Sequence, residues 1–159
     1  MPKTTQLRTF GLQANLRPMI TRSEMFTPLL EADPSFKERW QRFLADYADQ
    51  PEPPIYIALG ELAEHLVESR RRGDVERFDR VFETVERWHT EGDAYVSEAA
   101  LIGLPESLQG ILGGNDRTRA VNGVTASDFE PYFGPETTKW WDKLDRFWEG
   151  DTTALRLDI

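Results

Sequence analysis

Residues 55–112 decide the fold, because three runs with a helical repeat follow one another there with almost no chain between them. They read IYIALGELAEHLVESRRR (55–72), DVERFDRVFETVERWHTE (74–91) and GDAYVSEAALIGLPESLQGIL (92–112). In the first two runs, apolar residues recur every three or four positions, which is the period of an amphipathic α-helix. Connections of one or two residues force neighbouring helices to lie antiparallel, so we expect helical hairpins.

The third run is apolar on nearly every side between Tyr95 and Leu112. A helix of that composition is buried over most of its surface. Pro105 lies within it, and proline lacks an N–H group and clashes with the carbonyl group four residues earlier. We therefore expect residues 95–112 to form the central helix of the core, with a bend near Leu101.

Residues at the ends of these runs predict where the helices stop and start. Gly73 suits the left-handed conformation that closes many helices. Asp74 and Asp93 then stand at the N-cap positions of the second and third helices. Further along, Asp33-Pro34 and Gly134-Pro135 resemble helix starts with proline at the first helical position.

The flanking segments predict three more helices. A short one ends near Ala32 and has Pro28 inside it. The next has an apolar stripe of Phe36, Trp40, Phe43, Leu44 and Tyr47, and the last has an apolar face of Trp140, Trp141, Leu144, Phe147 and Trp148.

The chain has 159 residues, which is the usual size of one domain. We predict an all-α, single-domain bundle of about six or seven helices, built from antiparallel helical hairpins around a buried central helix (95–112). The expected parts are an N-terminal arm (1–22), a helical domain (23–149) and a C-terminal tail (150–159). The alternating residues 155–159 are the only candidate strand.

Composition and charge narrow the classes of partner. Acidic residues outnumber basic ones by 28 to 19, so the net charge is −9 and direct binding to nucleic acid or to an anionic membrane is disfavoured. No apolar run approaches the roughly 20 residues that span a bilayer. The sequence starts without a secretion signal and contains no cysteine, and we expect a cytoplasmic protein without thiolate metal sites. A partner with a basic surface is favoured.

The sequence shows no recognisable catalytic motif: no nucleophile elbow, phosphate-binding loop, dinucleotide-binding loop or zinc-protease helix is present. The spacing Glu86-x-x-His89 is half of a di-iron ligand set, but Leu62 stands where the second copy needs a carboxylate three residues before His65. We assign no catalytic residue, cofactor or metal. Both histidines are expected at the surface or at helix ends, and His89 in a last turn suits the helix dipole.

Candidate partner-binding residues are charged or aromatic side chains outside the expected core. Negative helix faces complement a cationic partner, although such faces are also the ordinary solvated side of a helix. Trp140 lies at the edge of its stripe, so we expect it to be partly exposed. The candidates are Glu61, Glu64 and Glu68 on the first helix, Glu76, Asp79, Glu83 and Glu86 on the second, Arg117 and Arg119 in the glycine-rich loop, and Trp140.

Several core and turn segments match a known pattern: Ile55 to Leu66, Phe82 to Glu86 followed by Gly92-Asp93, Val96 to Leu112, and Phe133-Gly-Pro135 with Trp140-Trp141 and Phe147-Trp148. Over about residues 36–149, the chain resembles a family of small all-helical bacterial proteins of uncharacterised function found among toxin-immunity genes. This resemblance implies an immunity protein that neutralises a cognate toxin by direct binding, without catalytic residues.

Two other readings remain open. One is a helical scaffold or adaptor, or a homo-oligomeric regulator that associates through Trp140. The other is a helical-bundle enzyme or metal protein that uses His65 or His89. The sequence leaves the oligomeric state and the binding face open.

Overall fold

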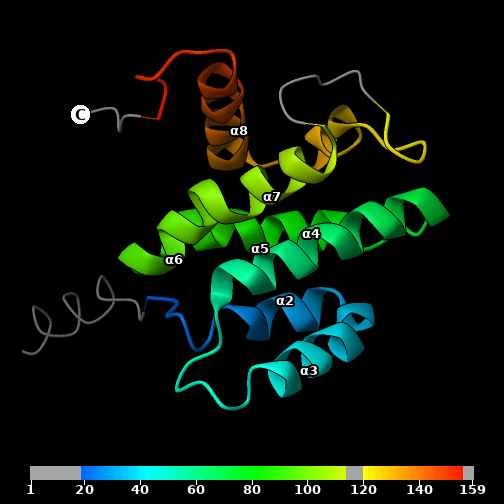
Figure 1. The fold of residues 1–159 in the computed structure, drawn as a ribbon, viewed down its shortest axis with the longest axis vertical. Coiled ribbons are helices and arrows are strands. Elements are labelled where there is room, and N and C mark those ends of the chain that lie inside the picture. Colours follow the sequence, from blue (N-terminus) through cyan, green and yellow to red (C-terminus); the bar gives the residue numbers. More distant parts are fainter. Residues whose placement is uncertain (1–18, 114–119, 156–159) are drawn as a thin grey trace, which may run out of the picture.

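The computed structural model describes residues 19–113 and 120–155, and its elements are helical. Within these limits there is no strand, only two isolated bridges. The all-α prediction is confirmed (Figure 1). The α-helices are α2 (Phe26–Ala32), α3 (Lys37–Asp46), α4 (Ile55–Arg72), α5 (Phe78–Glu91), α6 (Ala94–Glu98), α7 (Leu104–Ile111) and α8 (Pro135–Trp148). Shorter elements are the 3-10 turns η1 (Pro34–Phe36), η3 (Ala126–Asp128) and η4 (Glu130–Tyr132), and the π-helical turn η2 (Ala99–Gly103).

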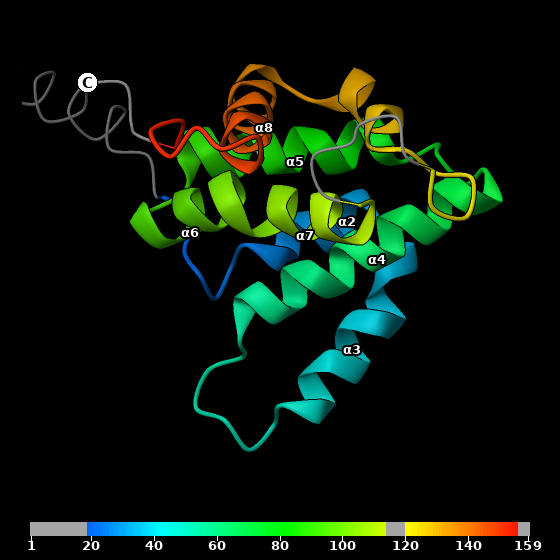
Figure 2. The same cartoon turned by 45° about the horizontal axis from the view of Figure 1, so that its top comes forward.

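The centre of the fold is a continuous helical rod made of α6, η2 and α7 (Figure 2). It packs against α4, α5 and α8, so helices cover it on several sides. Its inward residues are fully or almost fully buried: Val96, Ala99, Ala100, Gly103, Leu104, Leu108 and Leu112. The prediction of a buried central helix is confirmed.

The irregularity expected near Leu101 takes the form of the π-helical turn η2. Pro105 lies two residues after the end of this turn, in the first turn of α7, and is buried. In a regular α-helix its ring would press on the carbonyl group of Leu101, and that carbonyl would lose its hydrogen bond. A π turn bonds across five residues instead of four, which widens the helix at this point. The proline therefore explains the position of the π turn.

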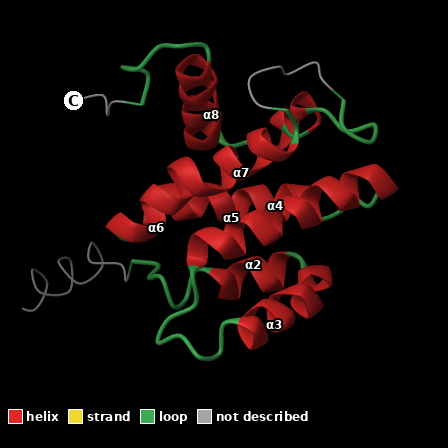
Figure 3. Ribbon diagram, viewed as in Figure 1, coloured by secondary structure: helices red, strands yellow, loops and turns green. Residues whose placement is uncertain are grey.

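The remaining helices form layers on the two sides of this rod (Figure 3). Helix α4 packs on α7 and also contacts α3, while α5 packs on α2, α6 and α8. In the view of Figure 3, α2 and α3 lie below α4 and α5, and α8 stands above the rod. Segments at both ends of the domain thus cover the central residues 55–112.

One predicted helix start is wrong. Gly73 has φ of 80° and closes α4 as expected, but α5 begins only at Phe78. The backbone N–H of Asp74 donates to the carbonyl of Ser69 at 2.8 Å, which completes the C-terminal cap of α4. The Asp74 carboxylate lies 3.3 Å from the Arg72 guanidinium. Asp74 therefore ends one helix and does not begin the next.

The other two aspartate caps are confirmed. The Asp93 carboxylate accepts a hydrogen bond from the backbone N–H of Val96 at 2.9 Å, and α6 starts directly after it. The Asp33 carboxylate accepts one from the backbone N–H of Ser35 at 3.1 Å, with Pro34 at the first position of η1. Both are local side-chain caps of the kind that short polar residues provide.

The ends of the domain differ in part from the expected pattern. Phe147 and Trp148, predicted to face the core, are 36% and 42% exposed because α8 has passed the core by its last turn. Beyond them Ala154 is buried and Leu155 lies in a turn, while the rest of the candidate strand and residues 1–18 of the predicted arm lie outside the described residues. No described helix combines the length and apolarity required to cross a membrane.

Candidate functional site

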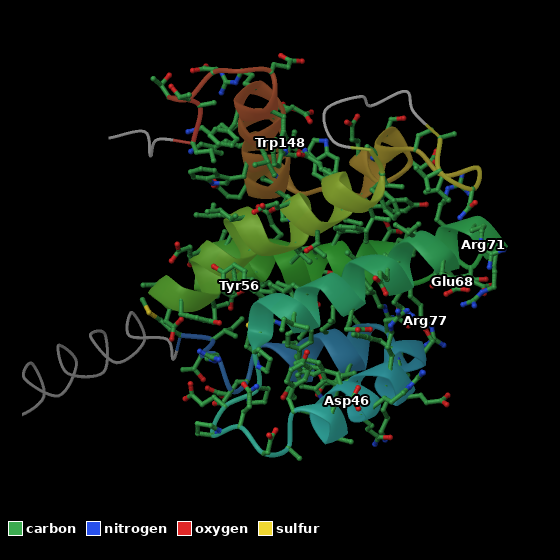
Figure 4. The ribbon with its side chains drawn as sticks, in the orientation of Figure 1. Asp46, Tyr56, Glu68, Arg71, Arg77 and Trp148 are labelled. Atoms are coloured by element: carbon green, nitrogen blue, oxygen red, sulfur yellow. The ribbon has the colours of Figure 1, made fainter. Side chains whose placement is uncertain are left out.

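The predicted acidic face of α4 is largely compensated inside the molecule. The Arg39 guanidinium from α3 reaches both Glu61 and Glu64, with N–O distances of 2.6 Å to each carboxylate. Further along α4, Glu68 lies 3.2 Å from Arg71, and Figure 4 shows both at the far end of the helix. These carboxylates pair with arginines of the same chain, so they add little free negative charge.

Glu86 on α5 has a structural role that local sequence does not show. Its carboxylate oxygens accept hydrogen bonds from the backbone N–H groups of Glu136 and Thr137, at 2.9 and 3.0 Å, and from the Thr137 hydroxyl at 3.0 Å. Glu86 thus caps the N-terminus of α8 from another helix. A Cβ atom at Gly134 would lie 2.5 Å from Cδ of Glu86, which explains the glycine there.

The remaining three acidic candidates all come from the segment that leads into α5 and from α5 itself. Glu76, Asp79 and Glu83 are exposed, and within residues 19–113 and 120–155 none of their side chains forms a hydrogen bond or an ion pair. Asp79 and Glu83 are four residues apart and therefore lie on the same side of the helix. Together with Glu76, they are the free carboxylates of the predicted set.

Asp79 and Glu83 border a groove of about 300 Å³ between α5 and the segment that runs from η4 into α8. We call it the α5 groove. Its lining residues are Asp79, Phe82, Glu83, Glu86, Arg87, Tyr132, Phe133 and Gly134.

Aromatic rings that pack on one another form the floor of the α5 groove. Phe82 is almost fully buried and stacks on Tyr132, with ring centroids 6.4 Å apart and an interplanar angle of 20°. Phe133 packs on Phe82 at 5.2 Å, and Phe78 meets Tyr132 edge to face at 5.3 Å. Tyr132 and Phe133 remain partly exposed. The floor is therefore apolar, fixed by packing and accessible in part.

The other charged residues of the groove are engaged elsewhere. The Arg87 Nε lies 2.9 Å from the Glu91 carboxylate, one turn further along α5. Glu86 is directed to α8, as described above. Consequently Asp79 and Glu83 give the groove its net negative character.

A second cluster, missed in the sequence, surrounds His65. This histidine is 7% exposed, not at the surface as predicted. Its Nε2 lies 3.1 Å from Oδ2 of Asp33 and 3.2 Å from Oγ of Ser35, and its ring stacks on Phe36. Its spacing from Leu62 was the available signal, because that spacing places His65 beside the buried face of α4.

The geometry of this cluster differs from that of a nucleophilic relay. In a Ser–His–Asp triad the hydroxyl and the carboxylate occupy opposite ring nitrogens. Here Asp33 and Ser35 both face Nε2 of His65, and the Ser35 hydroxyl donates to Oδ1 of Asp33. Burial raises the pKa of Asp33, but the hydrogen bonds from His65 and Ser35 outweigh burial, so the pKa is lowered overall. The cluster acts as a buried, extended helix cap.

His89 lies in the last turn of α5, as predicted. Both ring nitrogens are shielded from solvent and have no hydrogen-bond partner among the described residues. Burial lowers the pKa of His89, while the carboxylates of Glu86 and Glu136 oppose this effect only in part. Because the neutral ring carries no charge to complement the helix dipole, the dipole reading is wrong for His89 near neutral pH.

Of the last three candidates, Trp140 is the one that lies among the described residues. Trp140 is 5% exposed, and the Lys143 ammonium lies 4.6 Å from its ring centroid, so the expected exposure is wrong. The Lys139 ammonium also lies near the ring, 5.8 Å from its centroid, so two lysines of α8 flank it. Arg117 and Arg119 lie outside the described residues. Among the described residues, no group of three or more metal-ligating side chains is placed to hold an ion.

Other cavities lie away from the α5 groove. One, of about 430 Å³, lies near α2 and α3, and its apolar lining includes Phe26, Trp40 and Ile55. Another, of about 210 Å³, lies beside Asp33 and includes Arg77. Because the second contains several acidic and basic side chains together, its charges largely compensate one another.

A family model described as a domain of unknown function, DUF7674, matches residues 26–149. The chain belongs to this family. The match begins at the first residue of α2 and ends directly after α8, so it includes every residue that lines the α5 groove. No curated protein and no solved structure shows significant similarity to the chain.

Proposed function

We propose that this protein is an acidic binding domain whose partner is a protein with a basic surface. The observation that carries the proposal is the pair of unpaired, exposed carboxylates, Asp79 and Glu83, on the edge of an aromatic groove. Most of the other candidate carboxylates either pair with an arginine of the same chain or, like Glu86, cap a helix. Two of the three free carboxylates of the candidate set, Asp79 and Glu83, therefore border the same groove.

This arrangement has the features that protein interfaces use. Opposite charge on two surfaces speeds their encounter and fixes their orientation, more than it adds to final affinity. Affinity itself usually comes from a few well-packed anchors in desolvated pockets. The α5 groove combines a charged rim for the first effect with an aromatic floor for the second.

At the finer level, we propose that the partner is a cognate bacterial toxin and that binding neutralises it. The resemblance to small helical proteins found among toxin-immunity genes supports this reading. A toxin that cleaves nucleic acid needs a basic surface to hold its substrate, and an acidic domain can cover such a surface. Binding alone would then be enough, without any chemistry on the domain.

The test uses the product of the gene next to the one that encodes this chain. We expect the two proteins to purify as a complex and co-expression to relieve growth arrest caused by the neighbour. The double variant Asp79→Lys/Glu83→Lys should weaken binding by about 100-fold, because two attractions become repulsions.

The matched control is Asp46→Lys/Asp49→Lys, which changes the charge equally at the end of α3, where Figure 4 shows Asp46. It should change affinity by less than about threefold, because its charges lie outside the groove. Circular dichroism verifies that all variants are folded. The proposal is wrong if the neighbour is harmless and unbound, or if both double variants weaken binding equally.

A homo-oligomeric regulator is the second candidate, favoured by an exposed aromatic pair at the end of α8. Phe147 and Trp148 meet edge to face with ring centroids 5.7 Å apart, and both are exposed. If this pair forms a self-association surface, light scattering should give a mass above that of the monomer. Trp148→Asp should restore the monomer mass, and a monomeric wild-type protein would remove this candidate.

A further inference from the structure

We infer that the α5 groove accepts one arginine side chain of the partner, with its guanidinium group held between Asp79 and Glu83. This inference rests on the proposed function, since it names the chemical group that the acidic face would recognise. It also makes a claim of its own, because a basic partner could equally present lysine or a diffuse positive surface.

The size and shape of the groove suit a single long side chain. Its volume of about 300 Å³ lies at the lower limit of typical ligand pockets. The floor of Phe82, Tyr132 and Phe133 is apolar, and arginine has an apolar stem that packs on such surfaces while its head remains at the polar rim. A docked arginine would thus match the groove along its length.

The two carboxylates favour a planar cation. Asp79 and Glu83 are four residues apart on α5, so their Cβ atoms are separated by roughly 5–6 Å. A guanidinium group has several N–H donors in one plane and can donate to two carboxylates through different edges. An ammonium group is compact and offers no comparable planar match to both at once.

The aromatic floor adds a second reason to favour arginine. Tyr132 is partly exposed in the groove and is fixed by Phe82 and Phe78. Guanidinium groups stack on aromatic faces more readily than ammonium groups, and they lose less hydration when they do so. Tyr132 is therefore the residue that we expect to separate arginine from lysine.

The neighbouring charges do not oppose this assignment. Arg87, the one basic residue of the groove lining, is paired with Glu91 at 2.9 Å. Glu86 is bound to the N-terminus of α8, so it does not compete for the incoming group. The docked guanidinium would meet two free carboxylates and a compensated arginine.

The experiment is an NMR titration of the full-length, ¹⁵N-labelled protein with N-acetyl-arginine amide, and separately with N-acetyl-lysine amide. We expect shift changes confined to residues 79–86 and 132–134, and arginine binding about fivefold tighter than lysine. Equal affinities, or shift changes centred elsewhere, would overturn the inference.

Two sets of variants separate charge from stacking. Asp79→Asn/Glu83→Gln should weaken arginine binding at least about tenfold, while Asp46→Asn/Asp49→Asn leaves it within about twofold. Tyr132→Leu should lower arginine affinity to that of lysine, and Tyr132→Phe should keep the preference because the ring remains. If Tyr132→Leu does not fold, loss of the preference in Tyr132→Phe overturns the stacking step.

The results also distinguish this inference from the proposed function. A domain that binds its neighbour's product through Asp79 and Glu83, yet treats both amides alike, retains the function and loses the arginine assignment. A domain that prefers arginine amide but does not bind the neighbour's product keeps the groove assignment and loses the proposed partner.

Discussion

Asp33 joins two elements that are far apart in the sequence. It caps η1 through Ser35 and accepts a hydrogen bond from the buried ring of His65, 32 residues away. Replacing it with alanine removes a cap and takes from the buried imidazole the carboxylate that accepts its hydrogen bond. We expect Asp33→Ala to lower the free energy of unfolding by about 2–3 kcal/mol.

Urea unfolding followed by tryptophan fluorescence measures this loss. The matched control is Asp46→Ala, which removes an exposed aspartate at the end of α3 and should change stability by less than about 0.5 kcal/mol. A loss of similar size in both variants would contradict the role assigned to Asp33.

His89 predicts a pH dependence of stability. Burial holds the pKa of His89 below its ordinary value of 6.5. Below about pH 6.5 the unfolded chain therefore takes up a proton that the folded chain does not, and the free energy of unfolding falls as the pH drops towards the folded-state pKa. His89→Phe removes both the titration and the unsatisfied ring nitrogens.

We expect His89→Phe to be at least as stable as wild type and to show a flatter stability profile between about pH 6.5 and 5. Urea midpoints at several pH values across this window provide the comparison. The same slope in both proteins would show that His89 does not titrate as assigned.

Local and distant interactions differ in how far the sequence reveals them. The caps by Gly73 and Asp93 depend on neighbours within a few residues, and both were predicted. The contact of Glu86 with Thr137 joins residues 51 positions apart, and nothing in either segment indicates the other. The same holds for the pairing of Asp33 with His65, although the spacing of His65 from Leu62 does indicate that His65 is buried.

At the scale of elements, Glu86 fixes α8 to α5, and Gly134 leaves room for it. Glu86→Ala should lower the free energy of unfolding by about 2 kcal/mol, because three donors at the start of α8 lose their acceptor. Gly134→Ala should cost about 1–3 kcal/mol because the new methyl group collides with the Glu86 carboxyl group.

The losses in the free energy of unfolding caused by these two substitutions should not be additive. Once Glu86 is truncated, the methyl group at position 134 has space, so the double variant should resemble Glu86→Ala alone, with a coupling energy of at least about 1 kcal/mol. Urea unfolding of the four proteins gives this energy directly. Additive losses would mean that Glu86 and Gly134 act independently.

Helix starts were predicted where one local signal stood alone, and were missed where two signals competed. Proline after glycine marked the start of α8 correctly at Pro135. The signal at Asp74 failed because the backbone of the same residue closes α4. Trp140 was expected to be partly exposed and Trp148 to face the core, but the reverse is true. Helical spacing does not reveal where a helix extends beyond the core.

At the scale of the whole molecule, the net charge of −9 adds a long-range attraction for a basic partner to the local effect of Asp79 and Glu83. Association with a basic partner should slow about tenfold when the salt concentration rises from roughly 20 to 200 mM, because salt screens long-range attraction. Stopped-flow measurement of the association rate tests this. A tight complex whose association rate does not change with salt concentration would contradict electrostatic recognition.

The sequence predicts the acidic residues of the candidate site but not the groove that they border. The acidic row of the second helix and a preference for basic partners followed from composition and spacing. The α5 groove did not, because its opposite wall comes from Tyr132, Phe133 and Gly134, some fifty residues later. The pairing of carboxylates with arginines, which decides which carboxylates remain free, also arises only when the folded chain brings these residues together.

The π turn before Pro105 has a consequence for related chains. A helix that bonds across five residues instead of four accommodates one extra amino acid without growing longer, so the turn Ala99–Gly103 is equivalent to an insertion. Deleting a single amino acid there would press the proline ring against the preceding carbonyl group, whereas keeping the insertion relieves it. Insertion and proline should therefore be inherited together: family members without this proline should be one amino acid shorter between Asp93 and Gln109.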